Sequence, residues 1–293
     1  MAFIGDFPIQ SRIAVVTGAG SGINLAFAKL CVKRGARVII ADLKLTPDAG
    51  SYLRGEGAKA AIFVKSDVTK RAELENLIKT SEEKFGDVPD VYIAGAGVFE
   101  PTWSNFWDDT EDDGYAAVDI NVTHPIKFAR IALRALLRKN KKGVFLIVSS
   151  IAGFQGSFSS PLYAATKHAV TGFVRSMAEL DRLEGVKVVA CAPGVVATPL
   201  WTEAPEKLEQ YSYHPEYALT PERVAEDMLE LVVDGKYPGG TCLESSLGGT
   251  RTLGTWNIPE PEGYGTAIPT EFLEKNYKPM IEMMKKERGQ SKL

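Results

Sequence analysis

Short apolar runs alternate with longer amphipathic stretches along most of the chain. Runs rich in Val, Ile and Ala predict seven buried strands, at residues 13–17, 37–41, 61–65, 91–94, 143–148, 186–191 and 240–243. Between them, apolar residues at helical spacing predict helices at residues 22–34, 47–56, 71–85, 115–138, 161–183 and 221–234. Because short strands joined through helices pair in parallel, the pattern predicts an α/β fold. We expect a single doubly wound Rossmann-type domain whose seven-stranded, mainly parallel sheet carries helices on both faces.

Composition narrows the class of protein without indicating its chemistry. The chain has 293 residues, of which 45% are hydrophobic and 24% charged, as in globular proteins with a large core. Its net charge of -3 gives no reason to expect a nucleic acid or an anionic membrane surface as a partner. No signal-peptide pattern opens the sequence and no run of about 18 apolar residues occurs, so we expect a cytoplasmic protein that binds no membrane.

The cysteines and histidines show no spacing typical of metal ligands. Cys31, Cys191 and Cys242 lie far apart in the sequence. An odd, widely spaced set favours free thiols in a reducing compartment. His124 and His214 also lack a partner pattern, so no metal site is expected.

A glycine-rich turn follows the first predicted strand and opens directly onto a helix. Within the sequence TGAGSGI it contains Gly18, Gly20, Ser21, Gly22 and Ile23. Glycines let a pyrophosphate approach the backbone, and the start of the helix offers unpaired N–H groups and the positive end of the helix dipole. Glycine also marks ordinary loops, but the position after the first strand predicts dinucleotide binding.

The second strand runs to Asp42, about 20 residues beyond the last glycine of the turn. A carboxylate there can accept hydrogen bonds from both hydroxyls of an adenosine ribose and would repel a 2′-phosphate, which favours NAD over NADP. Residues 19–21 include no Arg or Lys to receive that phosphate, although Lys44 lies close by. The alternative is that Asp42 only caps the next turn.

The ends of the third and fourth predicted strands suit the same cofactor. Asp67 and Val68 follow the third strand and would face an adenine edge. Gly95, Ala96 and Gly97 follow the fourth strand and would form a floor lined by backbone atoms.

A hydroxyl, a phenol and an amine are gathered after the fifth predicted strand. Ser150 lies just beyond that strand, and Tyr163 and Lys167 are four residues apart on the next helix, where such residues share a face. A nearby ammonium favours the phenolate, so Lys167 would bring proton exchange by Tyr163 closer to neutral pH. Ser149, one residue nearer the strand, should point to the other face. Taken alone, a Tyr and a Lys at this spacing are more often ordinary neighbours on an amphipathic helix. The other motifs of the chain favour a functional role for the pair.

Together these residues resemble a classical short-chain dehydrogenase/reductase over roughly residues 12–247. The similarity is greatest to the NAD-preferring branch that includes prostaglandin-dehydrogenase-like enzymes. The resemblance rests on Thr17-Gly18-x-x-x-Gly22-Ile23, Asp42, Asp67-Val68, Gly95-Ala96-Gly97, Asn121, Ser149-Ser150, Tyr163-x-x-x-Lys167 and the sequence PGVVATP that begins at Pro193.

The resemblance implies a role for each matching position. Tyr163 would be the general acid/base, Lys167 would lower its pKa and hold the nicotinamide ribose, and Ser150 would bind the substrate oxygen. Asn121 would position Lys167 through a water molecule. The residues that would border the nicotinamide are Pro193, Gly194, Val196 and Thr198.

Two positions depart from the family pattern. Asn24 stands where the family usually has a third glycine, and its side chain could crowd the contact between helix and strand. Gly95 stands where the family usually has an asparagine, so a side chain that braces the sheet would be missing. These departures question the rigidity of the cofactor floor but leave the proton chemistry untouched.

Two regions outside the motifs could shape the substrate site. The aromatic and acidic stretch at residues 99–115 would form a wall of the cleft, cover the sheet edge or make a subunit contact, and Trp201 is a further wall candidate. Residues 1–250 would form the dinucleotide-binding and catalytic domain, and residues 251–293 an extension on the same domain or a neighbouring subunit. A helix is expected at residues 270–288, with an apolar face made by Phe272, Leu273, Tyr277, Met280, Ile281 and Met284.

The sequence therefore predicts an NAD-dependent oxidoreductase that interconverts a secondary alcohol and a ketone on a fairly apolar small molecule. Two alternatives remain open: an NADP-dependent ketone reductase, and a dinucleotide-binding scaffold without turnover. By resemblance, a homodimer or homotetramer would form through the helices at residues 115–138 and 161–183.

Overall fold

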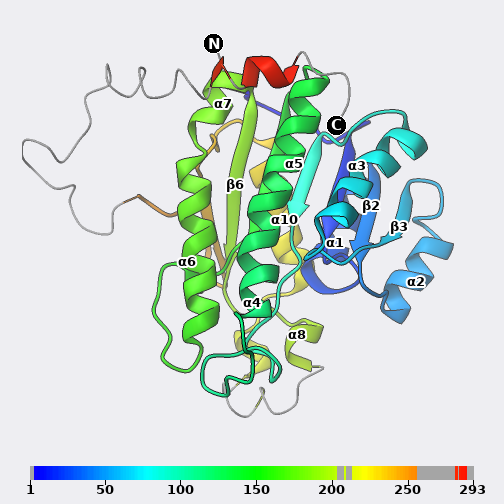
Figure 1. Cartoon of the computed structure of the whole chain (residues 1–293). Coiled ribbons are helices and arrows are strands. Elements are labelled where there is room, and N and C mark those ends of the chain that lie inside the picture. Colours follow the sequence, from blue (N-terminus) through cyan, green and yellow to red (C-terminus); the bar gives the residue numbers. More distant parts are fainter. Residues whose placement is uncertain (1–2, 203–207, 209–212, 256–280, 283, 289–293) are drawn as a thin grey trace, which may run out of the picture.

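The protein contains an eight-stranded sheet with the strand order β3-β2-β1-β4-β5-β6-β7-β8. In Figure 1 the labelled strands β3, β2 and β6 follow one another in this order across the sheet. The computed structural model describes residues 3–202, 208, 213–255, 281–282 and 284–288. Strands β1 to β7 pair in parallel, and only β8 runs antiparallel to its neighbour. The strands are β1 (Ile13–Thr17), β2 (Arg37–Asp42), β3 (Ala61–Lys65), β4 (Val91–Ala94), β5 (Gly143–Val148), β6 (Val186–Pro193), β7 (Cys242–Ser246) and β8 (Gly249–Thr252).

Helices cover both faces of this sheet. Successive residues of β1 show why, because Ala14 and Val16 pack into one apolar core while Val15 packs into the other. The first core is closed by α1 (Gly22–Lys33), α2 (Pro47–Arg54) and α10 (Pro221–Val233). The second is closed by α3 (Arg71–Phe85), α5 (His124–Arg138) and α6 (Pro161–Ser176). The predicted doubly wound Rossmann-type fold is confirmed.

The predicted number of strands was wrong by one. Strand β8 forms a hairpin with β7 through the Ser246–Gly249 pairing, and its residues are mostly exposed. Because the run GTRT is polar and lacks an apolar alternation, the hydrophobic pattern could not reveal it. The seventh predicted strand is also shifted, since β7 begins at Cys242 instead of residue 240.

The helix predicted at residues 115–138 is interrupted by a wider turn. It divides into α4 (Ala116–Val118), the π-helical turn η1 (Asp119–Thr123) and α5. Pro125 has no N–H to donate to the carbonyl of Asn121, so the regular helical bonding cannot run through this point. Such π turns often occur at functional sites, and this one carries Asn121.

The helix predicted at residues 161–183 is two helices, α6 and α7 (Glu179–Glu184). Neither glycine nor proline marks the break between them, at residues 177–178. The turn at Gly239 and Gly240 packs closely against Ala178, since a Cβ built on Gly239 would lie 2.9 Å from its carbonyl oxygen. The break between α6 and α7 therefore lies where the distant turn at Gly239 and Gly240 packs against the chain. No residue at the break predicts it.

The described end of the chain packs against the second core. Met284 is buried there and Ile281 packs beside it. Glu287 pairs with Arg130 and Arg134 of α5, at 3.3 Å in the case of Arg134. The other residues of the expected apolar face, Phe272, Leu273, Tyr277 and Met280, lie outside the described residues.

The strand order reverses between β1 and β4, which are neighbours although β2 and β3 separate them in sequence. Chains that leave these two strands go to opposite sides of the sheet, so their carboxyl ends border a crevice. Most of the residues singled out from the sequence follow the carboxyl ends of β1, β2, β4, β5 and β6. The remaining short elements are η2 (Ile151–Gly153), α8 (Pro199–Thr202) and η3 (Pro215–Tyr217).

Candidate active site

The glycine-rich turn after β1 is packed so closely that side chains would not fit. Gly18 has a φ of 69°, and a Cβ built on it would lie 2.6 Å from the Cα of Ala96. At Gly20 the added atom would lie 2.1 Å from the carbonyl oxygen of Lys44. The turn ends at Ser21, which caps the start of α1 in an extended conformation. The backbone is thus held as a bare cradle at a helix N-terminus.

A cavity of about 260 Å³ opens beside this cradle. Ser21 and Gly22 line one side and Ala197 and Pro199 the other. Gly22 has a φ of 58°, and a Cβ on it would come within 3.3 Å of the Thr198 side chain. The segment after β6 therefore borders the glycine turn directly.

Gly18→Ala is expected to destabilise the protein by about 2–4 kcal/mol, because it adds a backbone strain of about 1 kcal/mol to overpacking against Ala96. Gly5 is the matched control, since it has a φ of 67° and no atom within 4 Å of its added Cβ. Gly5→Ala should show the strain alone. Unfolding in urea measures both changes, and equal losses would contradict the close packing at Gly18.

Asp42 at the end of β2 serves the glycine turn itself. Its Oδ2 accepts a hydrogen bond from the Gly20 N–H at 2.8 Å, and its Oδ1 accepts one from the Lys44 N–H at 3.3 Å. The capping role that the sequence left open is therefore present. A carboxylate has further acceptor sites, so capping leaves room for a ribose hydroxyl as well.

Asp67 and Val68 follow β3 as expected, but the carboxylate of Asp67 is engaged locally. It accepts hydrogen bonds from the Thr69 N–H at 3.0 Å and the Thr69 hydroxyl at 2.7 Å. The bond from the Thr69 hydroxyl holds the pKa of Asp67 below its usual value. Val68 is buried in the second core.

The floor after β4 is braced, contrary to the expectation drawn from its missing asparagine. The Asn24 Nδ2 donates to the Gly95 carbonyl at 2.9 Å and to the Gly18 carbonyl at 3.3 Å. The Gly95 N–H donates to the Thr17 hydroxyl at 3.1 Å. Asn24 therefore does not crowd the contact between helix and strand, since it occupies space that glycine at position 95 leaves free.

Tyr163 and Lys167 lie on one face of α6, and the Lys167 ammonium is 5.4 Å from the centre of the Tyr163 ring. Lys167 is buried and donates to the Val148 carbonyl at 2.8 Å. A Cβ built on Gly97 would lie 3.8 Å from the Lys167 Nζ. The lysine thus stands between the end of β5 and the floor that follows β4.

The ionisation of this pair differs from the sequence-based expectation. Burial raises the pKa of Tyr163 to about 12, although its hydrogen bond with Ser150 acts to lower it. Burial also lowers the pKa of Lys167 to about 8. The predicted lowering of the Tyr163 pKa by Lys167 is therefore not seen, because removal of the phenol from water is the dominant effect on its pKa. At neutral pH the phenol is protonated and able to donate.

The two serines after β5 point to different partners. The Ser149 hydroxyl is 3.0 Å from the Thr171 hydroxyl, beneath α6. The Ser150 hydroxyl donates to the Pro193 carbonyl at 3.5 Å and accepts from the Ala152 N–H at 3.2 Å. Ser150 therefore lies with Tyr163 and with the segment after β6. In that segment the Gly194 N–H donates to the Ser245 carbonyl at 2.9 Å, and Val196 forms a β-bridge with Leu219.

Asn121 ties the loop after β4 to the helix that carries the pair. Its Oδ1 accepts from the Val98 N–H at 2.9 Å, and its Nδ2 donates to the Val98 carbonyl at 2.9 Å. The same Nδ2 is 3.2 Å from the Thr166 hydroxyl, one residue before Lys167. Asn121 thus acts on α6 through direct contacts.

Two neighbours of Tyr163, both at the start of the stretch at residues 99–115, were not singled out individually from the sequence. The Glu100 Oε1 accepts from the Tyr163 N–H at 2.9 Å and so caps the first turn of α6. The Phe99 ring lies edge-on to Tyr163 at 4.8 Å, and 5.0 Å from Trp201. No local signal singles out Glu100, because the helix it caps lies about 60 residues further along the chain.

The aromatic stretch at residues 99–115 divides between the site and the surface. Phe99 is buried against Tyr163, whereas Trp103, Phe106 and Trp107 are exposed. Trp107 packs on Phe158 with ring centres 4.9 Å apart. The loops after β4 and β5 are therefore joined by aromatic contacts.

His124 is buried beneath the crevice. Its Nε2 is 3.2 Å from the Thr17 hydroxyl and its Nδ1 is 3.1 Å from the Ile120 carbonyl. Burial lowers the pKa of His124 to about 4, and the nearby Lys167 acts in the same direction. A neutral imidazole is a packing and hydrogen-bonding group in this position.

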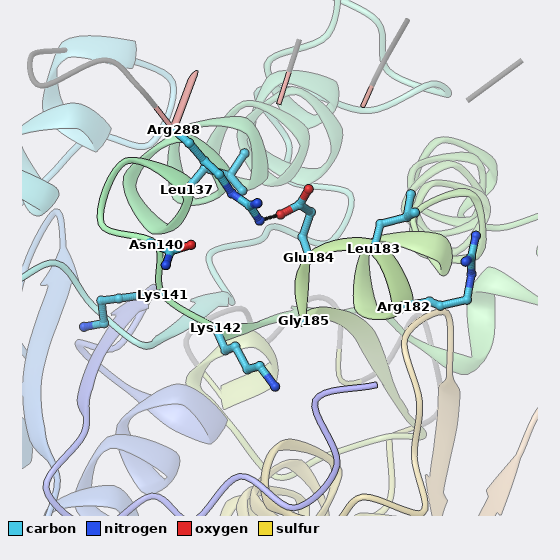
Figure 2. Close-up of a pocket in the computed structure, with 9 residues that line it drawn as sticks. All are labelled: Leu137, Asn140, Lys141, Lys142, Arg182, Leu183, Glu184, Gly185 and Arg288. Carbon is cyan, nitrogen blue, oxygen red and sulfur yellow. Dashed lines mark ion pairs between the residues drawn. The ribbon is translucent and has the colours of Figure 1, made fainter. Parts of the chain in front are cut away.

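A larger cavity, of about 380 Å³, lies at the opposite edge of the sheet (Figure 2). Lys142 and Gly185, which line it, precede β5 and β6. Arg288 and Glu184 face one another across it, whereas the side chains of Lys141, Lys142 and Arg182 point in different directions. Because ligands of such sheets bind at the carboxyl ends of the strands, this cavity is not a candidate cofactor site.

The described residues show neither a metal cluster nor a membrane span. No three His, Cys, Asp or Glu side chains among them are grouped to hold a metal ion. None of their helices combines the length and apolar character needed to cross a membrane.

Comparisons with known proteins agree with this geometry. The sequence profile of short chain dehydrogenases matches residues 12–209. An uncharacterized oxidoreductase of Staphylococcus aureus strain MRSA252 is 31% identical over 233 residues, covering 78% of this chain and 94% of that protein. Short-chain dehydrogenase reductase 3a of Arabidopsis thaliana is 32% identical over 208 residues, covering 70% and 79%. The crystal structure of gox2181 matches with a TM-score of 0.69 and 28% identity, covering 80% of this chain and 94% of that one.

Proposed function

The chain belongs to the short-chain dehydrogenase family, and from that premise we propose that it interconverts a secondary alcohol and a ketone with NAD as its cofactor. Membership makes the protein an oxidoreductase that acts on CH–OH groups with a nicotinamide cofactor. One observation carries the finer proposal: the bare glycine cradle, the Gly95–Gly97 floor and the buried Lys167 lie along one crevice.

The residues at the glycine turn fit the proposed cofactor. Glycine at positions 18 and 20 lets the turn pack against Ala96 and Lys44, and the turn leads directly into the N-terminus of α1, where backbone N–H groups would hold a pyrophosphate. Asp42 would receive the adenosine ribose. When bound, NAD supplies the acceptor for the hydride of the alcohol.

Tyr163 would move the proton. With its pKa raised to about 12, it is a general acid at neutral pH and would give its proton to a carbonyl oxygen during ketone reduction. During alcohol oxidation its phenolate would remove the hydroxyl proton. Ser150 would hold the substrate oxygen beside it, since the two side chains are hydrogen-bonded.

The substrate would be fairly apolar. Phe99 and Trp201 pack on one another and Phe99 packs on Tyr163, so the walls nearest the phenol are aromatic. Trp201 continues this wall by stacking with Tyr213, at 5.6 Å between ring centres. Such a surface favours a secondary alcohol on a carbon-rich body over a small polyol.

The test is direct. Purified protein should reduce NAD with a panel of apolar secondary alcohols and should oxidise NADH with the corresponding ketones. Tight dinucleotide binding without turnover across that panel would favour a scaffold. The braced floor removes one reason for a scaffold, because Asn24 restores a contact that the sequence suggested was lost.

Asp42→Asn is expected to weaken the preference for NAD by about tenfold or more, because it removes the charge that opposes a 2′-phosphate. The amide oxygen can still accept from Gly20, so the turn keeps its support, whereas Asp42→Ala would lose both. The ratio of kcat/KM for NAD and NADP measures the effect. A ratio unchanged in Asp42→Asn would assign Asp42 to capping alone.

We also propose a homodimer or homotetramer formed through α5 and α6. Ala165, Ala169 and Gly172 are exposed along one side of α6, which leaves room for the close approach of another helix. Light scattering of the purified protein would decide the oligomeric state.

A further inference from the structure

The side-chain amide of Asn24 bridges the segments that follow β1 and β4, the two strands that border the crevice. Asn24 is the third residue of α1 and is 7% exposed. Its Nδ2 donates both to the carbonyl of Gly18, which follows β1, and to the carbonyl of Gly95, which follows β4. These two hydrogen bonds therefore hold the glycine turn against the cofactor floor, beside the bond that the Gly95 N–H makes to the Thr17 hydroxyl.

This amide and a side chain at position 95 exclude one another. A Cβ built on Gly95 would lie 2.2 Å from the Asn24 Oδ1 and 2.4 Å from its Cγ. Both contacts are far shorter than real Cβ contacts, so a side chain at position 95 would displace the Asn24 amide from this place. The buried Oδ1 has no hydrogen-bond partner among the residues that the structure describes, so the side chain is held by its donor group and by packing.

We propose that Asn24 is a positioning residue for the dinucleotide, and that Asn24 and Gly95 form a reciprocal pair. In the family pattern, glycine at the position of Asn24 accompanies asparagine at the position of Gly95. Here the amide reaches the same gap from α1 instead of from the end of β4. The two departures from the pattern are thus one exchange, in which each change makes the other necessary.

The pairing of Asn24 with Gly95 bears on function because the two carbonyls that Asn24 bonds, those of Gly18 and Gly95, belong to the crevice. Gly18 lies against Ala96, with a Cβ-to-Cα approach of 2.6 Å if a side chain were added. Gly97, two residues beyond the braced Gly95, lies beside Lys167 and Asn121. Loss of the brace would let the glycine turn and the floor separate, and dinucleotide affinity would fall before the proton chemistry does. This step rests on the proposed function.

The test is a double-mutant cycle with NAD affinity and unfolding temperature as readouts. Asn24→Gly should raise the Kd for NAD about tenfold, as expected from the loss of two buried hydrogen bonds. Gly95→Asn should lower the unfolding temperature and the affinity further, because its side chain meets Asn24. The double variant Asn24→Gly/Gly95→Asn should recover most of both losses, which two independent defects would not do.

Asn24→Asp separates hydrogen bonding from packing. It keeps the shape of the side chain but replaces the amide donor by an oxygen that faces two carbonyl groups. It should therefore bind NAD more weakly than the wild type, with KM for NAD raised more than kcat is lowered. A side chain that only fills space would leave KM unchanged. All affinities are measured well below the unfolding temperature of every variant.

The outcomes are distinct. Wild-type affinity in Asn24→Gly, or losses that simply add in the double variant, would overturn the proposal. If the wild type bound no dinucleotide, the proposed function would fail. The unfolding temperatures of the wild type, the two single variants and the double variant would still show whether Asn24 and Gly95 depend on one another. Additive shifts would overturn the proposal, and recovery in the double variant would support it.

Discussion

Tyr163→Phe is expected to lower kcat by about 10²–10⁴-fold while changing the Kd for NAD little, because it removes one oxygen that exchanges a proton. The ring contact with Phe99 at 4.8 Å does not involve the hydroxyl, so the wall of the site should persist. Steady-state rates and fluorescence titration with NADH measure the two quantities. Tyr237→Phe is the matched control, since that hydroxyl donates to Glu230 at 3.3 Å, away from the crevice.

The pH dependence of the wild-type rate should report the ionisation of Tyr163 as well. Because burial raises the pKa of Tyr163 to about 12, the phenolate fraction grows with pH across the usual assay range. The rate of alcohol oxidation should therefore rise with pH by close to tenfold per pH unit until another step limits it. Full activity of Tyr163→Phe, or oxidation that is fastest in acid, would contradict the assignment of Tyr163.

Lys167→Met is expected to remove most activity and, at neutral pH, to stabilise the protein. The loss of activity should reach about 10–10²-fold, as expected when a charged hydrogen bond, here the one that would hold the nicotinamide ribose, is removed. Lys187→Met is the matched control, because Lys187 is equally buried and donates to the Asp234 carbonyl on another part of the sheet. That variant should retain its kcat.

The stability of Lys167→Met follows from the pKa of the buried amine. Burial lowers the Lys167 pKa from 10.5 to about 8, so between these values the unfolded chain binds its proton more tightly than the folded one. Below pH 8 the folded wild type bears the full cost of the buried charge, up to about 3 kcal/mol. The advantage of Lys167→Met should therefore be largest at pH 7 and disappear as the pH rises towards 10.5.

Urea unfolding of the two proteins at pH 7 and at pH 10 measures that difference. The loss of the donor to Val148 will offset part of the gain. A pH-independent difference would mean that Lys167 is not buried as a cation. Activity that falls while stability rises is the usual consequence of a strained functional group.

The sequence was sufficient to predict what depends on local patterns. Apolar runs such as residues 143–148 and 186–191 located β5 and the start of β6, because strands buried on both faces are continuously apolar. The glycine turn and the Tyr163–Lys167 spacing located the crevice, because each motif follows the carboxyl end of a strand.

What the sequence did not reveal depends on contacts between distant segments. The cap that Glu100 gives to α6 joins residues 63 positions apart, and β8 is too polar to show a strand pattern. The role of Asn24 was misjudged for the same reason. Its effect depends on Gly95, which lies 71 positions away in the sequence and reaches Asn24 only in the folded chain.

A structure of the NAD complex at atomic resolution would decide where the dinucleotide binds. We expect the pyrophosphate on the backbone of residues 18–23, the adenosine ribose at Asp42 and the nicotinamide ring beside the Tyr163 hydroxyl. A dinucleotide bound elsewhere, or one whose nicotinamide faces away from Tyr163, would contradict it.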